Sequence, residues 1–105
     1  MEETFVSPVY NVMRIPLDKI QCNTYNPNRM SPVEFQLLQR SIFEDGYTMP
    51  IVCYYDKKNN IYEIVDGFHR YLVMKECKEI AERENYFLSV SVINQPFENR
   101  ICEYN

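Results

Sequence analysis

The sequence predicts an α+β domain in which a small mixed β-sheet is packed with helices. Two observations predict this class: short strand-like runs of alternating polarity, and two longer runs with helical spacing between them. The length of 105 residues is enough for one modest core and too short for two. We therefore expect residues 1–105 to form a single domain, with its core in residues 13–94.

The N-terminal part of the chain predicts a strand followed by a loop. Residues 12–15 read as a short strand. Pro16 halts it, because proline cannot donate a hydrogen bond to a strand ladder. Residues 22–30 are rich in asparagine and contain a proline, a composition typical of a loop.

The strongest helix signal runs from Ser31 to Gly46. Ser31 is the expected N-cap, Pro32 takes the first helical position, and Glu34 completes a capping box. Gly46 is the expected stop. The inner face is predicted to comprise three apolar residues at helical spacing, Phe35, Leu38 and Ile42.

The middle of the chain predicts a hairpin and then a second helix. Strands are expected at residues 51–55 and 61–65, joined by the polar loop 56–60. One continuous helix is predicted from Phe68 onward, because apolar residues recur there at helical intervals. Its charged residues, Arg83 among them, are expected to form a solvated face.

A last strand is predicted before the C-terminal tail. Three residues of its buried face, Leu88, Val90 and Val92, alternate with Ser89, Ser91 and Ile93. The tail that follows Pro96 is expected to begin a further helix.

Composition and charge restrict the classes of partner. The formal net charge is −4 and no basic block interrupts it, so direct DNA binding by this chain is not expected. The absence of a long apolar run and of a leader pattern predicts no membrane span and a cytoplasmic location. The four cysteines lack the spacing of a zinc site or a redox pair, which predicts reduced and mostly buried thiols: Cys22, Cys53, Cys77 and Cys102.

The most informative stretch is "VDGFHR", residues 65–70, which contains the single histidine of the chain. If a helix begins at Phe68, its free backbone N–H groups and its dipole favour an anion. Gly67 permits close approach to the backbone, Arg70 can grip phosphate oxygens bidentately, and His69 adds a donor. A second interpretation stays open, in which Asp66 caps the helix, His69 is packed and Arg70 forms a surface ion pair.

The order of three segments, "MRIPLDKI", "LLQRSIFEDGYTMPIVCYY" and "YEIVDGFHRYLVMKE", resembles the N-terminal domain of the ParB family, which shares its fold with sulfiredoxin. The resemblance covers residues 13 to about 94. It implies a ParB/sulfiredoxin-like fold and a nucleotide site. One wall of that site would be formed by Gly46, Met49, Pro50 and Ile51, and the triphosphate would contact Gly67, Phe68, His69 and Arg70.

Departures from the family motifs refine this expectation. Phe68 stands where sulfiredoxin has its catalytic cysteine and where partition-type ParB proteins have a glutamate, so the resemblance disfavours sulfinic acid repair. The D-G-x-H-R form is similar to ParB-like proteins of phages and mobile elements, and to free serine kinases of this fold. Asn105 matches a metal-holding asparagine of a third ParB motif, and no helix-turn-helix domain is expected in this chain.

The resemblance implies a module that binds a nucleoside triphosphate, CTP or ATP with Mg²⁺, in a regulatory or DNA-associated role. Its nucleotide would change self-association or pairing with a DNA-binding partner. An alternative is a small-molecule kinase or NTP hydrolase with Asp66 as the catalytic carboxylate, although residues 22–30 offer no acidic residue as a base.

Two further alternatives carry less weight. A nuclease would need paired carboxylates to hold metal ions, for which only Asp66 with Glu63 or Glu44 is available. The other is an interaction domain that binds no nucleotide. It would use an aromatic contact patch of five tyrosines, Tyr54, Tyr55, Tyr62, Tyr71 and Tyr86.

Overall fold

The computed structural model describes residues 5–22 and 30–93. Its strands are β1 (Met13–Pro16), β2 (Ile20–Gln21), β3 (Ile51–Asp56), β4 (Ile61–Asp66) and β5 (Phe87–Ile93). Its α-helices are α1 (Pro32–Asp45), α2 (Phe68–Glu76) and α3 (Lys78–Arg83), and the 3-10 turns are η1 (Pro8–Tyr10) and η2 (Leu17–Lys19).

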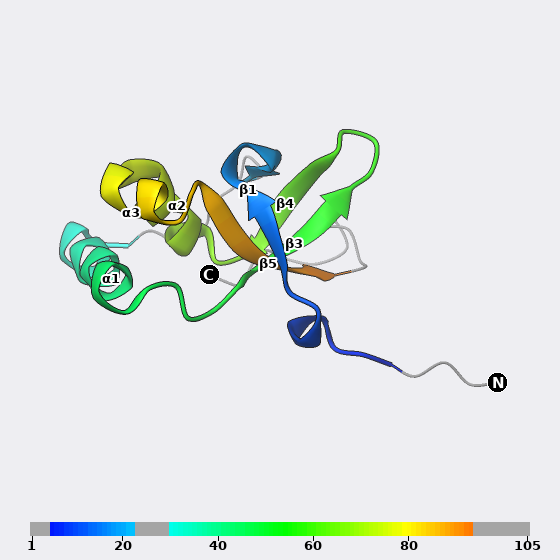
Figure 1. Ribbon diagram of the computed structural model, residues 1–105, viewed down its shortest axis with the longest axis horizontal. Coiled ribbons are helices and arrows are strands. Elements are labelled where there is room, and N and C mark those ends of the chain that lie inside the picture. Colours follow the sequence, from blue (N-terminus) through cyan, green and yellow to red (C-terminus); the bar gives the residue numbers. More distant parts are fainter. Residues whose placement is uncertain (1–4, 23–29, 94–105) are drawn as a thin grey trace.

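The five strands form one mixed sheet in the order β1-β5-β3-β4-β2. Antiparallel pairs join β1 to β5 and β3 to β4, while β3 runs parallel to β5 and β2 parallel to β4. Figure 1 shows the three α-helices gathered on one side, with the β3–β4 hairpin projecting away from them. The predicted α+β class, a small mixed sheet with helices, is confirmed.

The predicted hairpin and the first helix are observed with nearly the expected bounds. At the start of α1, the Glu34 amide donates to Ser31 Oγ at 3.2 Å and the Ser31 amide donates to Glu34 Oε1 at 3.1 Å. Gly46 follows the helix with φ of +81°, and its amide donates to the carbonyl of Ile42 at 2.8 Å. The capping box and the glycine stop therefore set the limits of α1 as predicted.

The prediction of one continuous second helix is wrong. Cys77 adopts an extended conformation, with φ of −113° and ψ of 100°, and separates α2 from α3. The break lets one residue of each helix meet in a small core cluster of Ile42, Val73 and Ile80. Tertiary packing decides this bend, since neither glycine nor proline marks it in the sequence.

Arg83 is exposed, as predicted, but its guanidinium also makes contacts across to α1. Its Nη1 donates to the carbonyl of Phe43 at 2.7 Å and its Nη2 donates to the carbonyl of Ile42 at 2.9 Å. These are carbonyls of the last turn of α1, where backbone partners are few; the Ile42 carbonyl also accepts from the Gly46 amide. The side chain therefore fastens α3 to the C-terminal end of α1.

The main core lies between the sheet and α2. Its most enclosed residues include Ile51, Cys53 and Val90 on the central strands and Met74 on α2, all at most 1% exposed. Burial raises the pKa of the Cys53 thiol to about 12. Cys22 and Cys77 are half-buried, and Cys102 lies outside the described residues. No helix in the described ranges is long and apolar enough to cross a membrane.

Candidate functional site

The candidate site is the corner at which β4 ends and α2 begins. Gly67 forms this corner with φ of +102° and ψ of 23°, in the left-handed region that favours glycine. A Cβ at this position would lie 2.7 Å from Ile51 Cγ2 and 2.9 Å from Arg70 Nη2. A side chain therefore cannot be added at residue 67 without displacing both neighbours.

Helix α2 begins at Phe68 as predicted, and its first turn has no side-chain cap. The N-cap residue is Gly67, which has no side chain, and no side-chain hydrogen bond caps the helix. The alternative in which Asp66 caps the helix is therefore wrong. The first N–H groups of a helix lack intrahelical partners, so they can donate to an external anion.

Arg70 lies folded back against the loop before β3. Its Nη2 donates to the carbonyl of Pro50 at 3.1 Å. Its Nε is buried and has no hydrogen-bond partner among the described residues. Arg70 also takes part in none of the ion pairs found in residues 5–22 and 30–93, so the alternative of a surface ion pair is wrong.

His69 and Phe68 differ in their surroundings. Phe68 packs against the main core, and its ring meets the imidazole of His69 edge to face at 5.4 Å. Burial lowers the pKa of His69 below its ordinary value. The imidazole is therefore neutral near pH 7 and offers one donor and one acceptor rather than a positive charge.

A hollow of about 110 Å³ opens at this corner. We call it the α2 hollow, and it is lined by Met30, Leu38, Gly67, His69 and Arg70. Its volume is well below the roughly 300–1,000 Å³ of sites that enclose a drug-sized ligand. The hollow therefore matches a single anionic group rather than a whole nucleotide.

Residues 46–51 connect α1 to β3 and pass beside the corner. Pro50 contributes its carbonyl to Arg70, and the side chain of Ile51, 1% exposed, supports Gly67 from within the core. Gly46 and Met49 do not line the α2 hollow, and Met49 is 60% exposed. The structure thus brings two of the four predicted wall residues to the corner.

Tyr47 is a site residue that the sequence reasoning missed. Its hydroxyl donates to the carbonyl of Arg70 at 2.8 Å, which fixes the loop to the first turn of α2. Desolvation, with a smaller contribution from Glu84, raises the pKa of this hydroxyl, so it remains a donor. Met30 and Leu38 were also missed as lining residues, because Leu38 carried only a core signal and Met30 carried none.

The remaining candidates are spread apart or lie outside the described residues. Glu44 forms an exposed ion pair with Arg40 on α1, and Glu63 lies within β4. No group of three or more His, Cys, Asp or Glu side chains that could hold a metal is present in the described part of the chain. Asn105 lies beyond it.

The five tyrosines of the predicted contact patch do not gather on one surface. The rings of Tyr55 and Tyr62 meet on the hairpin, with centroids 4.6 Å apart, and Tyr54 lies beside Tyr55 in β3. Tyr71 is buried in α2, and both it and Tyr86 line a separate cavity. A single aromatic patch is therefore not formed.

Comparison with known families gives one family match over most of the chain. The model of the ParB N-terminal domain matches residues 2–92. Among curated relatives, the uncharacterized protein YbdM of Escherichia coli K12 is 39% identical over 95 residues. That alignment covers 90% of this chain and 45% of YbdM, so the chain spans less than half of this relative's length.

Solved structures share the fold at low sequence identity. ParB from Caulobacter crescentus, complexed with CTP-γ-S, has a TM-score of 0.64 at 22% identity, over 85% of this chain and 49% of the ParB chain. Sulfiredoxin from Arabidopsis thaliana has a TM-score of 0.59 at 19% identity, over 84% of this chain and 90% of sulfiredoxin. SbnI from Staphylococcus aureus has a TM-score of 0.59 at 22% identity, over 82% of this chain and 32% of SbnI.

Proposed function

The chain belongs to the ParB N-terminal domain family, and on this premise we propose that it binds a nucleoside triphosphate with the phosphates at the first turn of α2. The observation that carries the proposal is Nε of Arg70, a buried donor with no described partner at the rim of a small hollow. An unsatisfied buried donor destabilises a protein by about 1–3 kcal/mol. A phosphate oxygen in the hollow would satisfy it.

Each residue of the corner would have a separate task. Gly67 lets Ile51 and Arg70 pack against the corner, and the uncapped N–H groups of α2 would donate to the phosphate. Arg70 supplies the positive charge, held in place by Pro50, and neutral His69 supplies one more hydrogen bond. The volume of the α2 hollow, about 110 Å³, is enough for a phosphate but not for a whole nucleotide. The ribose and base would therefore lie outside it, along residues 46–51.

The nucleotide and its role are part of the same proposal. CTP is the first candidate because the ParB relative from Caulobacter crescentus is complexed with CTP-γ-S, and ATP is the second. Mg²⁺ would accompany the triphosphate as its counter-ion. A module of this kind would use bound nucleotide to change its self-association, or its pairing with a DNA-binding partner, in a regulatory or DNA-associated process.

The test is thermal unfolding with CTP, ATP and GTP, each with and without Mg²⁺. At a concentration 100-fold above the dissociation constant, the ligand should stabilise the fold by about 2.7 kcal/mol. Arg70→Lys retains charge but loses the guanidinium fork, and His69→Gln retains a neutral donor. We expect Arg70→Lys to abolish most of the nucleotide-induced shift and His69→Gln to reduce it modestly.

The matched control is Arg40→Lys, at an exposed arginine on α1 that pairs with Glu44. It should leave the nucleotide-induced shift unchanged. The proposal fails if the folded wild-type protein shows no shift with any nucleotide, or if Arg70→Lys retains the full shift. Measuring phosphate release in the same samples, with Asp66→Asn alongside, separates a binding module from the kinase and hydrolase alternatives.

A further inference from the structure

A larger cavity lies on the other side of α2. Its volume is about 620 Å³, and it is bounded by the segment η2–β2, by α2 and by the turn that leads into β5. We call it the η2–α2 cavity, and its lining residues are Pro16, Leu17, Asp18, Ile20, Gln21, Tyr71, Lys75, Asn85, Tyr86 and Phe87. None of these residues lines the α2 hollow, so the two spaces are separate sites.

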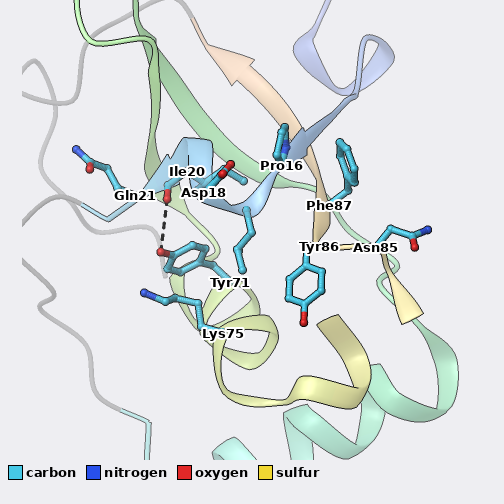
Figure 2. A pocket seen from close by; sticks show the side chains of 10 residues that line it. Pro16, Asp18, Ile20, Gln21, Tyr71, Lys75, Asn85, Tyr86 and Phe87 are labelled. Atoms are coloured by element: carbon cyan, nitrogen blue, oxygen red, sulfur yellow. Dashed lines mark hydrogen bonds between the residues drawn. The ribbon is translucent and has the colours of Figure 1, made fainter. Parts of the chain in front are cut away.

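The body of this cavity is apolar and aromatic. Figure 2 shows Tyr71 and Lys75 of α2 on one side and Tyr86 and Phe87 on the other. The hydroxyl of Tyr71 already donates to the carbonyl of Ile20, at 3.5 Å, which holds the ring in place. The volume lies within the roughly 300–1,000 Å³ range of small-molecule sites.

Two opposite charges stand at this cavity. Asp18 and Lys75 are both among its lining residues, and both are exposed. Neither takes part in any ion pair within the described part of the chain. The Lys75 ammonium instead lies 5.6 Å from the centroid of the Tyr71 ring. A ligand that bears one positive and one negative group would complement both charges at once.

The backbone at the rim is strained. Asn85 and Tyr86 both have positive φ, at 58° and 61°, although left-handed geometry is rare for an aromatic residue. The Tyr86 amide donates to the carbonyl of Ala81, and its own carbonyl accepts from the Leu17 amide, both at 2.8 Å. The side chain of Tyr86 remains 46% exposed, so these two hydrogen bonds, and not core packing, hold the left-handed turn after α3. Left-handed residues other than glycine occur at helix C-termini and at functional sites.

We propose that the η2–α2 cavity binds a zwitterionic amino acid with a large apolar or aromatic side chain. The ligand carboxylate pairs with Lys75 and the ligand ammonium pairs with Asp18. The ligand side chain packs against Tyr71, Tyr86 and Phe87. The site does not depend on the proposed nucleotide binding, because no residue is shared with the α2 hollow.

The experiment is a titration followed by amide chemical shifts, with phenylalanine and two matched derivatives as probes. N-acetylphenylalanine lacks the positive group, and phenylalaninamide lacks the negative group. Phenylalanine should shift the amide resonances of residues 17–21 and 85–87, and each derivative should bind at least about tenfold more weakly. Leucine tests whether the cavity also accepts a large aliphatic side chain. Binding of phenylalanine but not of leucine would restrict the ligands to aromatic amino acids.

Charge variants test the assignment of each group. Lys75→Gln should bring phenylalanine and phenylalaninamide to similar affinities, whereas Asp18→Asn should do the same for phenylalanine and N-acetylphenylalanine. Both residues are exposed, so the variants are expected to fold. Lys78→Gln is the matched control, because Lys78 is an exposed lysine on α3 that does not line the cavity.

Three results would overturn the proposal. The first is absence of binding by phenylalanine at millimolar concentration in a sample that unfolds cooperatively. The second is equal binding of all three probes, which would show that the two charges are not used. The third is a set of shifts confined to residues 67–70, which would place the ligand in the α2 hollow. Loss of nucleotide binding with retained phenylalanine binding would contradict the proposed function alone.

Discussion

At the scale of single residues, the candidate phosphate site depends on the absence of a side chain at residue 67. Gly67 has no Cβ, and the space where one would lie is filled by Ile51 Cγ2 and Arg70 Nη2. The guanidinium of Arg70 can therefore reach the carbonyl of Pro50 only because residue 67 is glycine. The position of the charge and the conformation of the backbone are determined by the same residue.

We expect Gly67→Ala to destabilise the protein by about 2–4 kcal/mol, because the variant combines a positive φ with a steric clash against Ile51. Gly46→Ala is a comparison for backbone cost alone, since Gly46 has φ of +81° and ψ of −179° and no atom lies within 4 Å of its added Cβ. Urea unfolding measures both losses. A loss below about 1 kcal/mol for Gly67→Ala would contradict a role for the clash.

Tyr47→Phe removes one hydroxyl and leaves the ring in place. We expect a loss of about 0.5–1.5 kcal/mol in unfolding free energy, because the Arg70 carbonyl loses its donor. Nucleotide affinity should fall as well, since the loop no longer fixes the first turn of α2. Tyr10→Phe is the control, at a tyrosine that is 82% exposed, and it should change neither quantity. An effect on stability without any effect on nucleotide affinity would limit Tyr47 to a structural role.

The residue-scale predictions from sequence succeeded where the signal was local. The start of α2 at Phe68, the glycine at the corner and the closeness of His69 and Arg70 all follow from six consecutive residues. The hydrogen bond from Tyr47 to Arg70 joins residues 23 positions apart. No local sequence pattern around either residue predicts it. The orientation of Arg70 toward Pro50 is likewise set by packing, so an ion pair was the reasonable local alternative.

At the scale of elements, Arg83 links two helices that are distant in sequence. We expect Arg83→Ala to lower the unfolding free energy by about 1–2 kcal/mol, because two carbonyls at the end of α1 lose a charged donor. This estimate lies low in the usual range because the side chain is 39% exposed. Lys78→Ala removes only an exposed pair with Glu82 and should change stability by less than about 0.5 kcal/mol. Similar losses for both variants would contradict the linking role.

The ends of a helix could be predicted from the sequence where capping residues or a glycine mark them. Helix α1 is limited by a capping box and a glycine, and both of its ends were predicted. The break at Cys77 has no such marker, and it arises because Val73 and Ile80 must both reach Ile42. Strand β2 has only two residues and is defined by its parallel pairing with β4. This pairing joins Ile20 to Tyr62, 42 positions apart in the sequence, so no local pattern predicts it.

At the scale of the whole molecule, the net negative charge of the chain predicts weak binding to duplex DNA. The formal net charge is −4, and the clearest cation at the candidate site, Arg70, is directed into the protein. We expect this chain to bind random duplex DNA more weakly than about 10⁻⁴ M at physiological salt. Fluorescence polarisation with labelled duplexes measures this, and single-stranded DNA of equal length serves as a comparison. Micromolar binding with a steep salt dependence would contradict the expectation.

The strand order has a consequence for how the chain is made. β5 lies between β1 and β3, where Ile51 is opposite Val90, so the last described strand completes a sheet whose other strands precede it. A nascent chain that has left the ribosome only as far as Tyr86 has unpaired edges on both β1 and β3. Unpaired apolar edges invite pairing with other chains. Emergence of residues 87–93 from the ribosome is thus the step that pairs the open edges of β1 and β3 and ends this exposure to aggregation.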